Sequence, residues 1–295
     1  MHEPKFYNHT EGRGGGGSID LVMHVAGYDF KGATAYLADR FGADAAAGAA
    51  VAHQTPAFHR WAERAELPAF DPPREDAGRW EQVRAYLVAE RSLSARFVDT
   101  LHEGGFVYAD RRGNAVFPRW DEERQVVGAA LRGTDPESAF KGLAAGSRRE
   151  EGHWAYSSGL KEYADRRPTL LLAESPIDAM SVHLLRYRGE TVRVVSTDGA
   201  GVLPAREIAT AVEKGWAIRG AFDHDKAGER LYWQLTQACR GAVDVGRERP
   251  RGKDWNEDLR EHAERRAQER EAGRQRVQER QRDRGRDRGG WDHDR

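Results

Sequence analysis

The chain has 295 residues, enough for one to three domains that each bury a hydrophobic core. Its 47 basic and 48 acidic residues nearly balance, so the net charge of −1 argues neither for nor against a nucleic-acid partner. The single cysteine, Cys239, excludes a disulfide framework and a cysteine-based zinc site, and is typical of a reducing compartment. No apolar run is long enough to cross a bilayer and no signal peptide follows Met1, so we expect a cytoplasmic protein with no membrane partner.

Residues 1–50 are predicted to form two short helices after a polar, glycine-rich start. The run Gly14 to Gly17 favours neither helix nor strand. Capping and apolar spacing predict helices over 18–27 and over 30–42. Residues 43–57 are Ala-rich and then polar, and DPPRED at 71–76 marks a further break, so residues 51–78 are predicted to be a linker.

Residues 79–160 have the pattern of a small α+β unit. Two helices are predicted first, over WEQVRAYLVAE and SARFVDTLHEG. Three short strands follow, FVYAD, NAVFPRW and QVVGAALRG, separated by the turn signals RRGN and DEER.

Residues 165–259 alternate strands and helices, which predicts an α/β domain. The apolar runs TLLLAES, VRVVSTDG, WAIRGAFDHD and AVDVG are separated by amphipathic helical segments, the first of which opens with a proline. Such alternation predicts a Rossmann-like parallel sheet with helices on both faces. Functional groups gather beyond the carboxyl ends of the strands in these sheets.

Residues 260–295 form a charged tail with 12 Arg against 9 Asp and Glu and no apolar periodicity. Its first half is predicted to be a solvated helix with Glu/Arg pairs four residues apart. The last part, RDRGRDRGGWDHDR, is predicted to be disordered. The excess of Arg would add weak, salt-sensitive affinity for DNA.

Three acidic residues follow strands of the α/β domain. Glu174 ends the first strand, and Asp223 and Asp225 end the third. Side chains two residues apart on a strand point the same way, so Asp223 and Asp225 are expected to share a face. Carboxylates crowded together repel one another and favour a divalent cation such as Mg²⁺. The alternative is that all three are ordinary helix caps and first-turn acids.

The segments ESPIDAMS, STDG, FDHDKAG and KDWNED resemble the motifs of the Toprim family, which includes bacterial primases, topoisomerases and some nucleases. The resemblance covers residues 169–259, and ESPIDAMS is most similar to Toprim proteins of plasmids and other mobile elements. It implies that Glu174 acts as general acid or base, and that Asp223 and Asp225 hold the metal ion, Mg²⁺ or Mn²⁺. Because it ends a different strand of the same domain, Glu174 is also expected to complete the metal site.

Two further elements of the resemblance carry weaker implications. Asp198 lies in the second turn, where the family more often has small residues, and is given a minor role. Lys253 and Asp254 match a late basic–acidic element and are expected to contact a nucleotide or tune the metal. The alternative for this pair is an ordinary solvated turn.

Residues 86–133 are similar to the helical and hairpin subdomain that precedes Toprim in bacterial primases. By position, the resemblance implies that Arg119, Arg132 and Lys141 bind template and nucleotide phosphates, which suits basic side chains. The alternative is that they are solvated charges on hairpin edges. Residues 6–42 are similar to the end of the primase zinc-ribbon module, but no cysteine precedes Cys239, so no zinc is expected.

Taken together, the motifs predict a Mg²⁺-dependent, primase-like nucleotidyltransferase in plasmid or mobile-element replication or transfer. Its expected partners are single-stranded DNA and nucleoside triphosphates, with a helicase or a relaxase as candidate protein partners. Two alternatives stay open, a Toprim nuclease and a non-catalytic DNA-binding adaptor of a mobile element. The primase-like upstream unit speaks against the nuclease.

Overall fold

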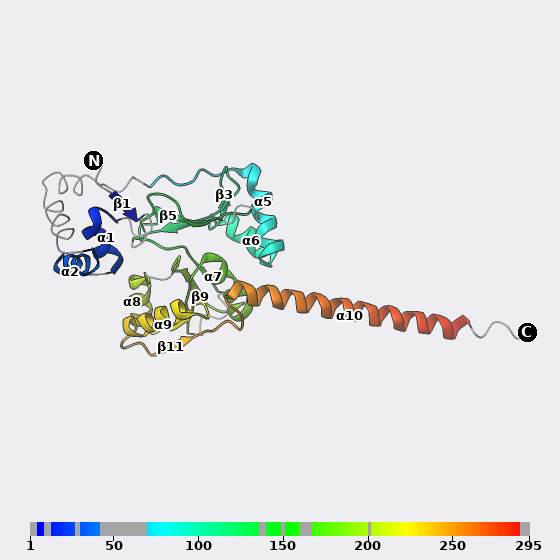
Figure 1. Ribbon diagram of the computed structural model, residues 1–295. Helices are drawn as coiled ribbons and strands as arrows, with labels where there is room; N and C mark the ends of the chain where they lie inside the picture. Colours follow the sequence, from blue (N-terminus) through cyan, green and yellow to red (C-terminus); the bar gives the residue numbers. More distant parts are fainter. Residues whose placement is uncertain are drawn as a thin grey trace, which may run out of the picture.

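The chain folds into three groups of elements, from which one long helix projects (Figure 1). The groups are an N-terminal hairpin with two helices, a four-stranded antiparallel sheet with its own helices, and a five-stranded mixed sheet. The computed structural model describes residues 5–8, 13–26, 30–41, 70–135, 140–148, 151–159, 167–199 and 202–289.

The N-terminal group is a two-stranded hairpin followed by two helices that pack around Ile19, Ala33 and Leu37. The prediction that the glycine run is neither helix nor strand was wrong, because most of it pairs with the preceding strand. Gly15 has no room for a side chain, since a Cβ there would lie 2.5 Å from the Asp20 Cβ. The elements are β1 (Lys5–Asn8), β2 (Arg13–Gly16), α1 (Gly17–Ala26) and α2 (Phe30–Phe41).

The second group is an antiparallel sheet of order β3-β4-β5-β6 with helical segments beside it. The three strands predicted here are present, and Ser94 caps the second helix by accepting from the Phe97 N–H. The elements are η1 (Ala77–Arg79), α5 (Trp80–Ala85), η2 (Tyr86–Glu90), α6 (Ala95–Glu103), β3 (Tyr108–Ala109), β4 (Ala115–Trp120), β5 (Val126–Arg132) and β6 (Lys141–Leu143).

Part of the predicted linker belongs to this second group. Tyr108 donates a hydrogen bond to the Pro73 carbonyl at 2.7 Å, and Glu75 forms an isolated bridge with Asp110. Phe70 packs against the small core on this side of the sheet. Residues 70–78 therefore lie on the sheet, while residues 51–69 lie outside the described part of the chain.

The third group is the predicted α/β sheet, with strand order β11-β10-β8-β9-β7. Four of its strands are parallel, and β7 is antiparallel to β9. The residues of strand β7 fall within the predicted upstream unit, 79–160, where no strand was predicted for them, but β7 pairs with this sheet. The elements are β7 (Ala155–Ser158), β8 (Thr169–Ala173), α7 (Pro176–Val182), η4 (His183–Tyr187), β9 (Val192–Ser196), α8 (Ala205–Glu213), β10 (Ala217–Ala221), α9 (Lys226–Ala238) and β11 (Asp244–Arg247).

Two hydrophobic cores cover the two faces of the five-stranded sheet. Leu171 and Ala173 of β8 belong to one core, and Leu170 and Leu172 belong to the other. This double burial explains why the strand reads as an unbroken apolar run. The first core also contains Val83 and other residues of the α5–α6 region, so the second and third groups are joined by a shared core.

Helix α10 (Trp255–Gly289) starts inside the protein and then extends away from it (Figure 1). Trp255 and Leu259 are buried, whereas residues 264–279 are exposed. The prediction that residues 282–289 are disordered was wrong, since the helix continues through them. Ion pairs along the helix, such as Arg274–Glu271 at 2.7 Å, support it where no core does. None of the described helices is long and apolar enough to cross a membrane.

Candidate active site

Three turns meet at the carboxyl edge of the parallel strands. Glu174 follows β8, Asp198 follows β9, and Asp223 follows β10. The three strands are adjacent and parallel, so their carboxyl ends lie at one edge of the sheet. The sequence therefore predicted correctly that Glu174 and Asp223 come together there.

Glu174 joins two of these turns. Its side chain is buried, and its Oε1 accepts a hydrogen bond from the Asp223 backbone N–H at 3.0 Å. Burial, with contributions from the nearby carboxylates of Asp225 and Asp178, raises the pKa of Glu174. A carboxyl group with a raised pKa at a sheet edge is suited to hold or pass a proton.

Asp223 and Asp225 lie beyond β10, which ends at Ala221, so the expectation that they share a strand face was wrong. Asp225 caps α9, because its Oδ1 accepts from the N–H groups of Ala227 and Gly228, each at 2.8 Å. Asp223 is half-buried, and burial together with neighbouring carboxylates raises its pKa to about 8. Its Oδ1 is buried and has no hydrogen-bond partner among the described residues.

Asp178, which the sequence reasoning missed, is a further member of the acidic cluster. It lies in the first turn of α7 and accepts from the Ser175 hydroxyl at 2.5 Å and from the Asn256 N–H at 3.2 Å. Burial raises its pKa, and the carboxylate of Asp254 adds to this effect. The signal was present in ESPIDAMS, where an acid stands in a helix start that is otherwise apolar.

Lys253 and Asp254 are brought to the same cluster by the loop before α10. The Lys253 carbonyl accepts from the His224 N–H at 3.1 Å, which ties this loop to the turn after β10. Asp254 accepts from the Glu257 N–H at 2.8 Å and raises the pKa of both Asp178 and Asp223. The side chain of Lys253 is exposed.

Arg132 and Lys141 line a pocket of about 110 Å³ that Glu174 of the acidic cluster also lines. They are direct partners in the register of β5 and β6, so the two cations stand side by side at one end of the small sheet. The same pocket is lined by Glu174, and Lys141 is close enough to oppose the rise in the pKa of that carboxyl group.

Arg119 does not belong to this basic pair, which corrects the expectation that it lies on a DNA-binding surface. Its side chain is fully buried, and its Nε lies 2.7 Å from Oδ2 of Asp198. It also donates to the backbone carbonyls of Arg148 and Gly152. Through the ion pair with Asp198, the buried Arg119 is a structural link between the small sheet and the turn after β9.

The acidic cluster has the chemistry of a divalent-cation site. Within the described ranges, no three His, Cys, Asp or Glu side chains are already placed to ligate one metal ion. Mg²⁺, however, is often held by only one or two carboxylates together with water and substrate phosphates. The unpartnered Oδ1 of Asp223 and the all-oxygen donor set fit such an ion.

Comparison with known proteins places this site in a family. Residues 171–259 match the family model described as Toprim-like. Residues 171–259 form a Toprim-like domain. Upstream of the Toprim-like domain, residues 85–157 match a family described as a protein of unknown function (DUF3991).

One curated relative is the 65 kDa protein of Zymomonas mobilis subsp. mobilis, which is 34% identical to this chain over 268 residues. The match covers 86% of this chain but only 44% of the relative, so the chain spans less than half of that protein.

The fold is similar to solved primases, at low identity. The primase fragment of the bacteriophage T7 primase-helicase protein has a TM-score of 0.45 and 18% identity, covering 71% of this chain and 84% of that chain. The zinc-binding and RNA polymerase domains of the Aquifex aeolicus primase have a TM-score of 0.38 and 17% identity, and the match covers 87% of this chain and 70% of that chain.

Proposed function

We propose that the protein is a Mg²⁺-dependent, primase-like nucleotidyltransferase that acts on single-stranded DNA. The observation that carries this proposal is the pocket that Arg132 and Lys141 of the small sheet line together with Glu174 of the Toprim-like domain. Two cations and a carboxyl group that line one pocket suit a substrate that brings phosphates and a metal ion together.

Each group has a distinct part in this proposal. Arg132 and Lys141 bind the triphosphate of the incoming nucleotide. Asp223 and Asp225 hold Mg²⁺, which neutralises phosphate charge when it is bound. Glu174, held by the Asp223 N–H, receives the proton of the attacking 3′-hydroxyl. The hydroxyl oxygen bonds to the α-phosphorus of the triphosphate, and pyrophosphate leaves.

The biological setting is part of the proposal. We assign the reaction to replication or transfer of a plasmid or another mobile element, with single-stranded DNA and nucleoside triphosphates as partners. The ESPIDAMS wording supports this setting. A helicase or a relaxase would supply the single strand, and Lys253 and Asp254 would contact the nucleotide or tune the metal.

The test is to incubate the purified protein with single-stranded DNA, labelled ribonucleotides and Mg²⁺ or Mn²⁺. The Asp223→Ala, Asp225→Ala double variant is compared with Glu213→Gln, which alters an exposed acid of α8 away from the cluster. We expect new labelled oligonucleotides from the wild type and the control, and none from the double variant.

Two other outcomes would replace the proposal. Shortened DNA without new product would indicate a Toprim nuclease that uses the same acids. Binding of single-stranded DNA with neither synthesis nor cleavage would indicate a non-catalytic adaptor, in which the basic pair matters and the acids do not.

A further inference from the structure

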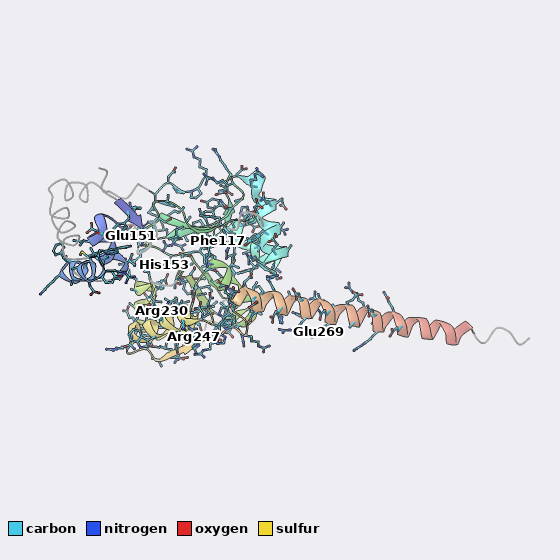
Figure 2. The ribbon with its side chains drawn as sticks, in the orientation of Figure 1. Phe117, Glu151, His153, Arg230, Arg247 and Glu269 are labelled. Atoms are coloured by element: carbon cyan, nitrogen blue, oxygen red, sulfur yellow. The ribbon has the colours of Figure 1, made fainter. Side chains whose placement is uncertain are left out.

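Arg247, which belongs to none of the recognised motifs, lies directly behind the turn that carries Asp223. It is the last residue of the edge strand β11 and is paired in register with Gly220 of β10, three residues before Asp223. Its side chain is only 7% exposed although it stands at the edge of the sheet. It lies beside the yellow ribbon of α9 (Figure 2).

The guanidinium group of Arg247 bridges the two ends of the acidic turn. Its Nη1 donates to the Gly228 carbonyl at 2.7 Å, and its Nη2 donates to the Asp223 carbonyl at 3.0 Å. The planar fork of arginine allows two such bonds in fixed directions, which a lysine ammonium group does not provide.

Two aromatic rings hold the guanidinium in place. Its central carbon lies 5.7 Å from the ring centre of Phe222 and 5.3 Å from that of Tyr232. Glu229 adds a half-exposed ion pair at 3.4 Å. The head group therefore has little freedom, and its two donors stay directed at the turn.

The other side of the turn is packed just as closely. A Cβ at Gly228 would lie 2.1 Å from the Asp223 carbonyl oxygen, so only glycine lets α9 start this close to Asp223. The Asp223 carbonyl is thus confined by Gly228 and held by Arg247. Its amide N–H is held by Glu174, at 3.0 Å.

We infer that Arg247 is a positioning residue for the cation site, because it fixes the backbone from which Asp223 and Asp225 extend. This inference rests on the proposed function of the acidic cluster. It adds a residue from the edge strand, 22 or more positions along the chain from both acids, to the parts that determine cation affinity. Arg247 touches neither substrate nor metal in this role.

The test is the affinity of the full chain for Mn²⁺ alone, measured by the loss of the free-ion paramagnetic resonance signal well below the unfolding temperature. The variants are Arg247→Met and Arg247→Lys. The matched control is Arg249→Met, because Arg249 pairs with the same Glu229 at 3.2 Å but, among the described residues, forms no hydrogen bond with the turn.

We expect Arg247→Met to weaken Mn²⁺ binding about tenfold, the equivalent of about 1.4 kcal/mol. Arg247→Lys should recover only part of this loss, and Arg249→Met should bind as the wild type does. Gly228→Ala, which displaces the Asp223 carbonyl from the other side, should weaken binding in the same direction and covers the case in which Arg247→Met does not fold.

The outcomes separate the two proposals. Wild-type affinity in both Arg247 variants would overturn the positioning role while leaving the cation site intact. A merely structural role would lower the melting temperature without changing the Mn²⁺ affinity of the folded protein, and would also overturn it. A wild type that binds no Mn²⁺ would overturn the cation site itself, and this role with it.

Discussion

Two regions of the protein bury ionisable side chains, but only one of them provides each side chain with a matching partner. In the seam, defined here by the pair Arg119–Asp198, which joins the small sheet to the turn after β9, and by the pair Tyr156–His183, whose rings pack against Phe97 of α6, each buried group meets a partner. In the acidic cluster of Glu174, Asp178, Asp223, Asp225 and Asp254, the carboxylates other than Asp223 accept hydrogen bonds from neutral donors, and none of the five forms an ion pair among the described residues. Their mutual repulsion adds to the effect of burial on the pKa of Asp223.

The difference indicates what each region is for. A buried charge without an opposite charge is costly, and folding alone gives no reason to retain it. Arg119 neutralises Asp198 after β9, the strand next to β8, which carries Glu174. A buried acid at this edge of the sheet can therefore be paired with a basic side chain. The gathering of acidic groups without a basic partner at this edge therefore supports the proposed cation site.

The largest effect on stability is expected when a substitution removes one residue of the ion pair in the seam. Arg119→Met leaves the Asp198 carboxylate buried without its partner, so the free energy of unfolding should fall by about 3–5 kcal/mol. Thermal or urea unfolding followed by circular dichroism measures this loss.

The control for this prediction removes the remaining charge. Arg119→Met combined with Asp198→Asn should recover much of the stability, and asparagine tolerates the positive φ of 52° at this position. If the single and double variants are equally destabilised, packing of the long arginine side chain, and not the ion pair, holds the seam together.

The opposite result is expected in the acidic cluster. Asp223→Asn removes charge from a site that repels it, so the melting temperature without metal should rise. Mg²⁺ should then stabilise the wild type but not the variant, since a ligand that binds only the folded state raises its stability. Differential scanning fluorimetry with and without Mg²⁺ measures both effects, and a lower melting temperature in the variant would contradict the comparison.

The sequence predicted the acidic cluster better than the seam, and the reason is physical. Glu174 and Asp223 follow apolar runs, and strand-helix alternation alone places such ends at one edge. Arg119 also follows an apolar run, but its burial depends on Asp198, 79 positions away in the chain. Local patterns do not distinguish a cation that faces solvent from one that meets a distant carboxylate.

The same limit explains the other differences. Strand β7 follows the small sheet in sequence, yet its partner is β9 in the other sheet, a choice made by distant contacts. Asp178 stands in an apolar helix start, and only the tertiary contact with Asn256 shows that it joins the cluster. Arg247 acts through two backbone carbonyls, which no side-chain motif records.

A smaller, pH-dependent effect is expected from the second pair of the seam. Burial lowers the pKa of His183 to about 4, so the ring stays neutral in the folded protein, 2.5 Å from the Tyr156 hydroxyl. An unfolded histidine takes up a proton near pH 6.5. The stabilisation from His183 is therefore complete above pH 6.5 and is lost as the pH falls toward 4.

His183→Gln removes this titration while keeping a hydrogen-bonding side chain. Urea unfolding between pH 7 and pH 4 should show a shallower loss of stability in the variant, by at most about 1.4 kcal/mol per pH unit. Burial lowers the pKa of His153 to about 4 as well, so the variant is still expected to lose some stability as the pH falls. The stability of the variant at each pH must therefore be compared with that of the wild type. Parallel curves for the two proteins would show that folding does not lower the pKa of His183.

The smallest effect is expected from an ion pair that has the geometry of the seam without its burial. Arg84 and Asp99 form two short hydrogen bonds, at 2.6 and 2.9 Å, but about a third of each side chain is exposed. Water already solvates both charges, so their attraction is screened and partly cancelled by the cost of ordering two side chains. Arg84→Met should therefore shift the melting temperature far less than Arg119→Met. A comparable loss in both variants would mean that the bonds themselves, and not the absence of water, make the seam strong, and burial would no longer explain why the uncompensated acids of the cluster need a cation.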